Sequence, residues 1–210
     1  MNWVRKSVLS LCVSALAGCG DVSPSPSISA QSATGSVPAW TRPPDPMGLA
    51  EQAGLTPDVR EYFEYHVHAH LDVFVDGQPV VIPGGIGIET TDPAVKRFGE
   101  NGFGGIPEEG CGQACISPLH THDVDGVIHV EAQTVTGFTL GQFFEQMALR
   151  LDSACVDEYC VPDTNIVVYV DGQPHSGDPA DIVFRDLQEI AIVIGTPPAE
   201  IPDSFAGEQP

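Results

Sequence analysis

The chain has 210 residues, of which 29 are acidic and 8 are basic, so its formal net charge at pH 7 is −21. Such an acidic surface repels phosphate groups, which excludes binding to nucleic acid through the surface and favours the attraction of cations. The chain also contains six cysteines and seven histidines, most of which lie close to one another in the sequence.

The first 46 residues are typical of an export signal followed by a tether. Arg5 and Lys6 precede an apolar run that is too short to span a bilayer, and Leu16-Ala17-Gly18-Cys19 resembles a bacterial lipobox. The resemblance implies cleavage after residues 1–18 and acylation of Cys19, which would anchor the mature chain to a membrane. An ordinary secretory signal is the alternative, and both interpretations place the protein outside the cytoplasm. Residues 19–46 would then be a flexible Ser/Pro-rich tether.

The rest of the chain predicts one α+β domain over residues 47–196, followed by a disordered tail over 197–210. Without residues 1–18 the net charge becomes −23, because that segment holds two basic and no acidic residues. Helices are expected at 56–64 and 140–151, the second with a capping box from Thr139 to Gln142. Strands are expected at 65–75, 79–82, 86–89, 165–170, 182–184 and 189–194, with a hairpin at 118–132. This order indicates a single mixed sheet, β-grasp-like by analogy, with the hairpin as an insertion.

Four cysteines remain in the domain, which indicates two disulfides in an oxidising compartment, with three possible pairings. The spacings favour the local pairs Cys111–Cys115 and Cys155–Cys160 over cross-pairing. A second interpretation of Cys111 and Cys115 is a redox pair or a pair of thiolate ligands for Cu(I), because they precede the hairpin.

The hairpin at 118–132 carries the strongest functional signal. Side chains alternate along a strand, so His120, His122, His129 and Glu131 share one side while the aliphatic residues share the other. Two registers are open. A two-residue turn at 125–126 would place His122 opposite His129, and a four-residue loop at 123–126 would place His120 opposite His129.

A second histidine group lies on the strand at 65–75, where His66, His68, His70 and Asp72 alternate with aliphatic residues. His66 and His70 would be about 13 Å apart along an extended strand, so all three imidazoles cannot bind one ion. Either His68 with His70 or His66 with His68 would join the hairpin, and two neighbouring ions are a further option.

Imidazole ligands suit zinc, copper, nickel and iron, and three of them on neighbouring strands are typical of zinc and copper sites with an open position. Asp72, Asp123 and Asp125 are candidate acceptors that orient the imidazole N–H groups. For Asp123 and Asp125 a plain role in the turn is an equal alternative. Glu131 is a candidate ligand or general base, and His175 has the setting of an ordinary surface residue.

The motifs HxHxHLDVFVDG, LHTHDxxGVIHVE, FTLGQFF and QEIAIVIG, spread over residues 64–195, resemble a family of exported or membrane-anchored bacterial and archaeal proteins. The resemblance implies that residues 64–195 form one domain. It comes with no assigned activity and therefore says nothing about the chemistry of the site.

The sequence therefore predicts an envelope lipoprotein that binds copper or zinc through His120, His122 and His129, with help from His68 and His70. A metal-dependent hydrolase or copper oxidase is the runner-up, with Glu131 as base and residues 99–106 as the candidate substrate pocket. A third interpretation is an interaction or pH-sensing domain without metal, because grouped imidazoles protonate together at acidic pH.

Overall fold

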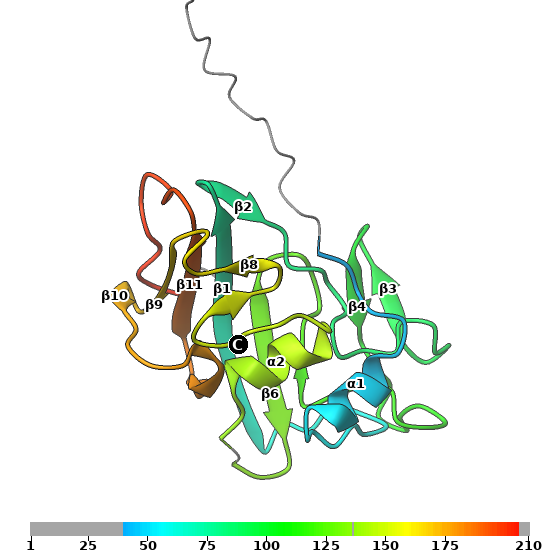
Figure 1. The fold of residues 1–210 in the computed structure, drawn as a ribbon. Coiled ribbons are helices and arrows are strands. Elements are labelled where there is room, and N and C mark those ends of the chain that lie inside the picture. Colours follow the sequence, from blue (N-terminus) through cyan, green and yellow to red (C-terminus); the bar gives the residue numbers. More distant parts are fainter. Residues whose placement is uncertain (1–39, 136, 206–210) are drawn as a thin grey trace, which may run out of the picture. The chain divides into compact units, whose positions relative to one another are not determined.

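A mixed β-sheet organises the domain, as the computed structural model shows for residues 40–135 and 137–205 (Figure 1). The lipobox and Cys19 lie outside these residues. The central strand β1 (Tyr65–Val75) is parallel to β11 (Gln188–Ile194) and antiparallel to β6 (Val127–Ala132). Beyond them lie β5 (Leu119–His120) on one side and β9 (Ile166–Val170) with β10 (Gln173–Pro174) on the other.

The edge of β1 that faces away from β11 is shared by two partners. Strand β2 (Gln78–Val80) pairs with its last three residues, and β6 pairs with residues 65–70. Without the hairpin β5–β6, the remaining order is β2-β1-β11-β9-β10, with the parallel pair in the centre. The predicted α+β class is therefore confirmed, and the topology agrees with a β-grasp-like sheet that carries an inserted hairpin.

The hydrophobic core lies on the aliphatic side of this sheet. Helix α2 (Leu140–Gln146) buries Phe143 and Phe144 against residues of β1, β6 and β11, including Leu71 and Ile128. The predicted capping box is present, since the Thr139 side chain accepts from the Gln142 backbone and the Gln142 side chain accepts from the Thr139 backbone. The helix ends earlier than expected, because Ala148 adopts a left-handed conformation with φ of 55°.

The predicted helix at 56–64 is wrong. Backbone groups of Asp58 and Val59 pair instead with the loop that contains Cys111, Cys115 and Ile116, so tertiary pairing overrides the local helix signal. A helix does form earlier, as α1 (Pro46–Gln52), with Asp45 as its N-cap.

Two further predicted strands are replaced by short contacts. Residues 86–89 and 182–184 make only isolated bridges, through Ile88 to Ile116 and through Val183 to Thr139. The structure also contains two small hairpins, formed by β3 (Lys96–Phe98) with β4 (Gly102–Gly104) and by β7 (Cys155–Val156) with β8 (Tyr159–Cys160), and a 3-10 turn at Pro179–Asp181.

The described part of the domain extends beyond residues 47–196 at both ends. Trp40 packs edge-on against Phe144, with ring centroids 5.6 Å apart, and Arg42 donates to the carbonyl of Gly84. At the other end, the Phe205 ring lies 6.2 Å from the ring of His70. The tether and tail composition therefore does not prevent residues 40–46 and 197–205 from packing on the domain.

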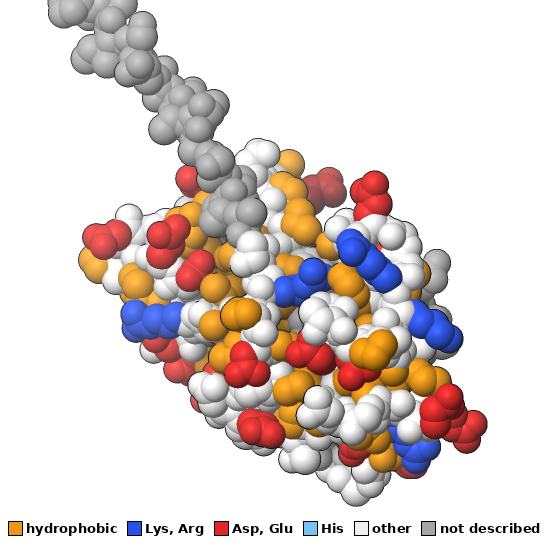
Figure 2. Space-filling view, turned by 90° about the vertical axis from the view of Figure 1, so that its right-hand side faces the viewer, with side chains coloured by type: hydrophobic (Ala, Val, Ile, Leu, Met, Phe, Trp, Pro, Cys, Tyr) orange, Lys and Arg blue, Asp and Glu red, His pale blue; other side chains and the backbone are white. Residues whose placement is uncertain are grey.

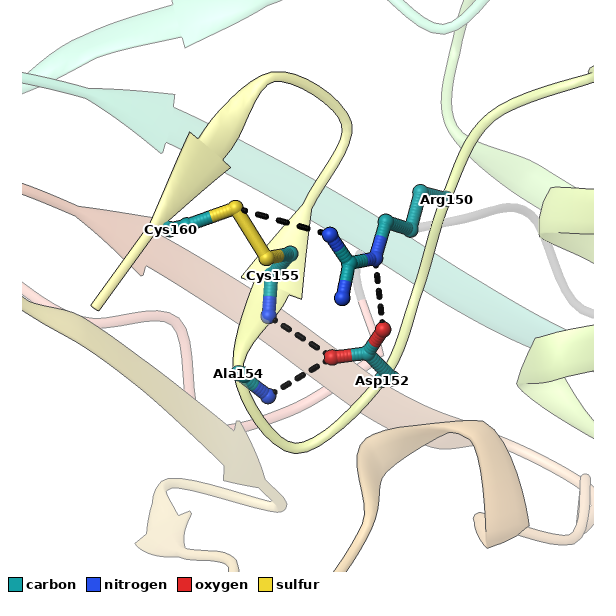
Figure 3. Close-up of a disulfide and its surroundings, with 5 residues drawn as sticks. All are labelled: Arg150, Asp152, Ala154, Cys155 and Cys160. Carbon is teal, nitrogen blue, oxygen red and sulfur yellow. Dashed lines mark hydrogen bonds and ion pairs between the residues drawn. A yellow bond between two sulfur atoms is a disulfide. The ribbon is translucent and has the colours of Figure 1, made fainter.

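Both local disulfides are confirmed, Cys111–Cys115 and Cys155–Cys160. Figure 3 shows the second one, where Asp152 accepts from the backbone of Ala154 and Cys155 and pairs with Arg150. Because all four sulfurs are bonded, none of them is a thiolate ligand in this state.

Candidate metal centre

Strand pairing places the histidines of three neighbouring strands in one row. His68 of β1 lies opposite His129 of β6, which in turn lies opposite His120 of β5. His66 lies opposite Glu131 in the same way. The hairpin therefore has the register of the four-residue loop at 123–126.

The donor atoms of these side chains lie close together. His68 Nε2 is 3.0 Å from His66 Nε2 and 2.9 Å from His129 Nδ1. Glu131 Oε1 is 3.3 Å from His66 Nε2, 3.4 Å from His129 Nδ1 and 3.9 Å from His120 Nε2. Tetrahedral zinc with bonds near 2.05 Å would separate its donors by about 3.3 Å.

Two overlapping groups follow from these distances, and His129 belongs to both. His120, His122, His129 and Glu131 each offer a donor atom within 4.8 Å of the others, as do His66, His68 and His129. These groups could hold a metal ion. We call their six residues the histidine cluster: His66, His68, His120, His122, His129 and Glu131.

The tautomers of His120 and His122 follow from their hydrogen bonds. His120 Nδ1 lies 2.9 Å from the carbonyl of Ser117, and His122 Nδ1 lies 2.7 Å from the carbonyl of Phe103. A carbonyl only accepts, so each Nδ1 carries the proton and each Nε2 keeps its lone pair. Metal-binding histidines are held in this way, because the bond to the carbonyl fixes the ring and leaves the other nitrogen available.

Burial favours the neutral form of three imidazoles in the cluster, those of His68, His120 and His129. It lowers the pKa of His68 to about 4 and that of His129 to about 3, in both cases with help from neighbouring imidazoles. His120 is fully buried, which lowers its pKa well below the usual value. Burial raises the pKa of Glu131. Within the described chain, His120 Nε2 and Glu131 Oε2 are buried without a hydrogen-bond partner, as expected for atoms that face a ligand.

Glu61 is a site residue that sequence reasoning missed. Its Oε1 lies 3.8 Å from His122 Nε2, and burial together with the charge of Glu131 raises its pKa. The expected helix at 56–64 concealed it, because the segment instead pairs through Asp58 and Val59 with residues 111–116.

The disulfide Cys111–Cys115 fastens this segment to the site. The amides of Cys111 and Cys115 donate to the carbonyls of Val59 and Asp58, and Asp58 is bridged to Ile116. Ser117, whose carbonyl fixes His120, follows directly. One small loop thus positions both Glu61 and the acceptor of His120.

Residues 99–106 form a wall of the site. The Phe103 carbonyl accepts from His122, and a Cβ on Gly104 would lie 2.6 Å from His122 Nδ1, so this position requires glycine. A pocket of about 380 Å³ opens elsewhere, beside His120 and Glu131, with Leu55 and Phe138 among its lining residues. From the expected pocket stretch 99–106, Ile106 lines a further pocket of about 540 Å³ together with Glu61.

His70 does not lie in the histidine cluster. Its Nε2 is 2.8 Å from the carbonyl of Asp125, and its Nδ1 is 3.0 Å from Glu189 Oε2 and 3.6 Å from Asp72 Oδ2. His66 and His68 therefore form the pair that joins the hairpin, and the expected contribution of His70 to this site is wrong.

The two aspartates of the hairpin loop have turn roles, and His175 lies apart from the site. Asp123 accepts from the amide of Val124, and Asp125 accepts from the amide of Val127. His175 follows β10 in a separate loop. On the face shown in Figure 2, acidic and apolar side chains are mixed and no histidine side chain is visible.

Comparisons with known proteins do not assign this chain to a family. No family model, no curated protein and no solved structure matches the chain. Among the residues that the structure describes, no helix has the length and apolar character needed to cross a membrane.

The lowered pKa values predict that metal-free protein loses stability as the pH falls. Below about pH 6.5 the unfolded chain protonates His68, His120 and His129, whereas the folded chain does not. Each such group lowers the free energy of unfolding by up to about 1.4 kcal/mol per pH unit between its two pKa values. Urea unfolding of metal-free protein from pH 7.5 to 5 measures this effect.

The variant His129→Gln isolates one of these groups. The raised pKa values of Glu131 and His70 act in the opposite direction, and they remain in both proteins. The variant should therefore show a shallower decline in stability with falling pH than the wild type. Parallel curves would contradict a buried neutral His129.

Proposed function

We propose that this protein is an extracytoplasmic lipoprotein that binds a transition metal, copper or zinc, through the histidine cluster. The observation that carries the proposal is the pair of hydrogen bonds from His120 and His122 to backbone carbonyls. They leave two Nε2 lone pairs directed at a site that also contains His129 and Glu131. Without a metal, the burial of so many neutral imidazole donors would only cost stability.

The choice of metal follows from the donors. Imidazole is a borderline ligand that suits copper and zinc, while a single carboxylate adds charge compensation. Because burial lowers the pKa of His68 and His129, few protons compete with the ion at these two ligands near neutral pH.

The location outside the cytoplasm is supported by two observations. Two disulfides are expected in an oxidising compartment and are rare in the cytosol. The lipobox around Cys19 supports anchoring through acyl chains, with the Ser/Pro-rich segment as spacer.

Elemental analysis of residues 20–210, exported to the periplasm and purified without a histidine tag, tests the proposal. We expect about one equivalent of copper or zinc, and loss of that metal in the triple variant His120→Ala, His122→Ala, His129→Ala. Protein that contains no metal, and takes up neither Cu(II) nor Zn(II) on dialysis, would leave a partner surface or a pH sensor as the better explanation.

A single substitution gives the quantitative form of this test. His122→Ala should lower metal affinity at least about 10-fold. Loss of a residue that only hydrogen-bonds to a metal ligand already lowers affinity about 10–100-fold. His175→Ala is the matched control and should leave the affinity unchanged. Equal dissociation constants for the two variants, measured by competition with a chromogenic chelator, would remove the hairpin from the site.

The disulfide Cys111–Cys115 should matter for metal affinity, because its loop holds the Ser117 carbonyl and the segment of Glu61. The double variant Cys111→Ser, Cys115→Ser should bind metal about 10-fold or more weakly. The control Cys155→Ser, Cys160→Ser removes a disulfide of similar loop length that does not contact the cluster. If both pairs of substitutions lowered the affinity equally, the effect would be one of general stability.

A metal-dependent hydrolase is the second candidate, and the pocket beside His120 and Glu131 favours it. A volume of about 380 Å³ with apolar and polar walls suits a small substrate. Glu131 Oε1 lies among the imidazoles, so Glu61 is better placed than Glu131 to serve as the base. A metal ion would supply activation of a water molecule.

Hydrolysis of p-nitrophenyl acetate by zinc-loaded protein separates the two candidates. An enzyme should lose its zinc-dependent rate at least about 100-fold in Glu61→Gln while retaining its zinc. Wild-type rates no higher than those of free zinc would leave binding as the function.

A further inference from the structure

A second set of metal-ligand side chains lies on the same side of the sheet, outside the histidine cluster. His70 and Asp72 of β1 adjoin Glu189 of β11, and each offers a donor atom within 4.8 Å of the other two. Strand pairing fixes this arrangement, since His70 lies directly opposite Glu189. His70 and Glu189 are buried.

The hydrogen bonds of His70 direct its Nδ1 toward two carboxylates. Its Nε2 is 2.8 Å from the carbonyl of Asp125, which only accepts, so Nε2 carries a proton. Its Nδ1 then faces both oxygens of Glu189, at 3.0 and 3.1 Å, and Asp72 Oδ2 at 3.6 Å. In the neutral imidazole, the Nδ1 lone pair and two carboxylates converge. A positive charge must lie between them, either a proton or a metal ion.

The charge balance favours the metal ion. A proton on Nδ1 compensates only one of the two carboxylates, although the Glu189 side chain is completely buried. A divalent ion beside a neutral imidazole compensates both, and buried charge without compensation is costly. The distance of 3.0 Å from Nδ1 to Glu189 Oε2 fits a hydrogen bond and equally fits two neighbouring ligands of an octahedral ion with bonds of about 2.1 Å, so it is compatible with either cation.

We propose that His70, Asp72 and Glu189 form a second metal site, which binds a harder divalent cation such as Mn(II). One imidazole and two carboxylates are harder donors than the histidine cluster, which is the basis for the different preference. Asp72 is the accessible ligand, with 30% of its side chain exposed, and so provides the route of entry. The ring of Phe205 covers His70.

The second site is independent of the proposed function. The Nε2 of His70 is bound to Asp125, and no residue of the second site belongs to the histidine cluster. Asp125 lies in the loop of the histidine hairpin, so the second site holds that loop against β1 and β11 without sharing a ligand with the first.

Mn(II) titration of metal-free residues 20–210 at pH 7.5, followed by the electron paramagnetic resonance signal of free Mn(II), tests the proposal. We expect one bound equivalent, retained in the variant His120→Ala, His129→Ala. Glu189→Gln and Asp72→Asn should each weaken binding at least about 10-fold. The control Asp163→Asn, at an exposed position, should bind as the wild type does.

Several outcomes would overturn the second site. They are no Mn(II) binding by the wild type, equal binding by Asp72→Asn, and loss of binding in the histidine-cluster variant. If Glu189→Gln does not fold, the partly exposed Asp72 decides the matter. Nitrogen chemical shifts of His70 add a direct readout, because an imidazolium that persists at pH 8 in the presence of Mn(II) would show that a proton fills the site. Copper or zinc at the histidine cluster is measured separately by elemental analysis, so either site can fail alone.

Discussion

The antiparallel register between β1 and β6 is the constraint on which the rest of the site depends. It places His68 opposite His129 and His66 opposite Glu131, and it places Ala69 opposite Ile128 on the core side. A shift of one residue would turn imidazoles into the core and aliphatic side chains into the site. The same pairing that buries the hydrophobic core therefore assembles the histidine cluster, and neither can be changed without the other.

Strand pairing alone would leave the imidazoles free to rotate, and the loops around the sheet remove that freedom. The carbonyls of Ser117 and Phe103 fix two rings, the first from a loop and the second from the short strand β4. Gly104 lets its segment approach His122 more closely than any side chain would allow. The stretch before the hairpin, with the small hairpin β3–β4, the disulfide Cys111–Cys115 and Gly104, thus supports the site.

The sequence was sufficient for those parts of the site that depend on alternation. Parity along 65–75 and 118–132 identified the face of every cluster member on the strands, and the β1 bounds agree with the expectation. It was insufficient where backbone groups pair over long distances. Glu61 lies on a segment with a good helix start, yet Asp58 pairs with Ile116, nearly sixty residues away. His70 lies on the same face of β1 as His66 and His68. What distinguishes it is Glu189, which is its neighbour in the sheet but lies far away in the sequence.

The contrast between His70 and His68 shows how one strand face supports two kinds of chemistry. Burial, helped by the neighbouring imidazoles of His129 and His66, lowers the pKa of His68 to about 4. His70 is also buried, but the attraction of Glu189 and Asp72 outweighs that burial and raises its pKa. The two rings are only two residues apart. Their difference therefore arises from the neighbouring strands, β6 with its histidine and β11 with its carboxylate. The one strand that pairs with β1 on each side, β6 or β11, converts a repeated sequence pattern into two chemically distinct positions.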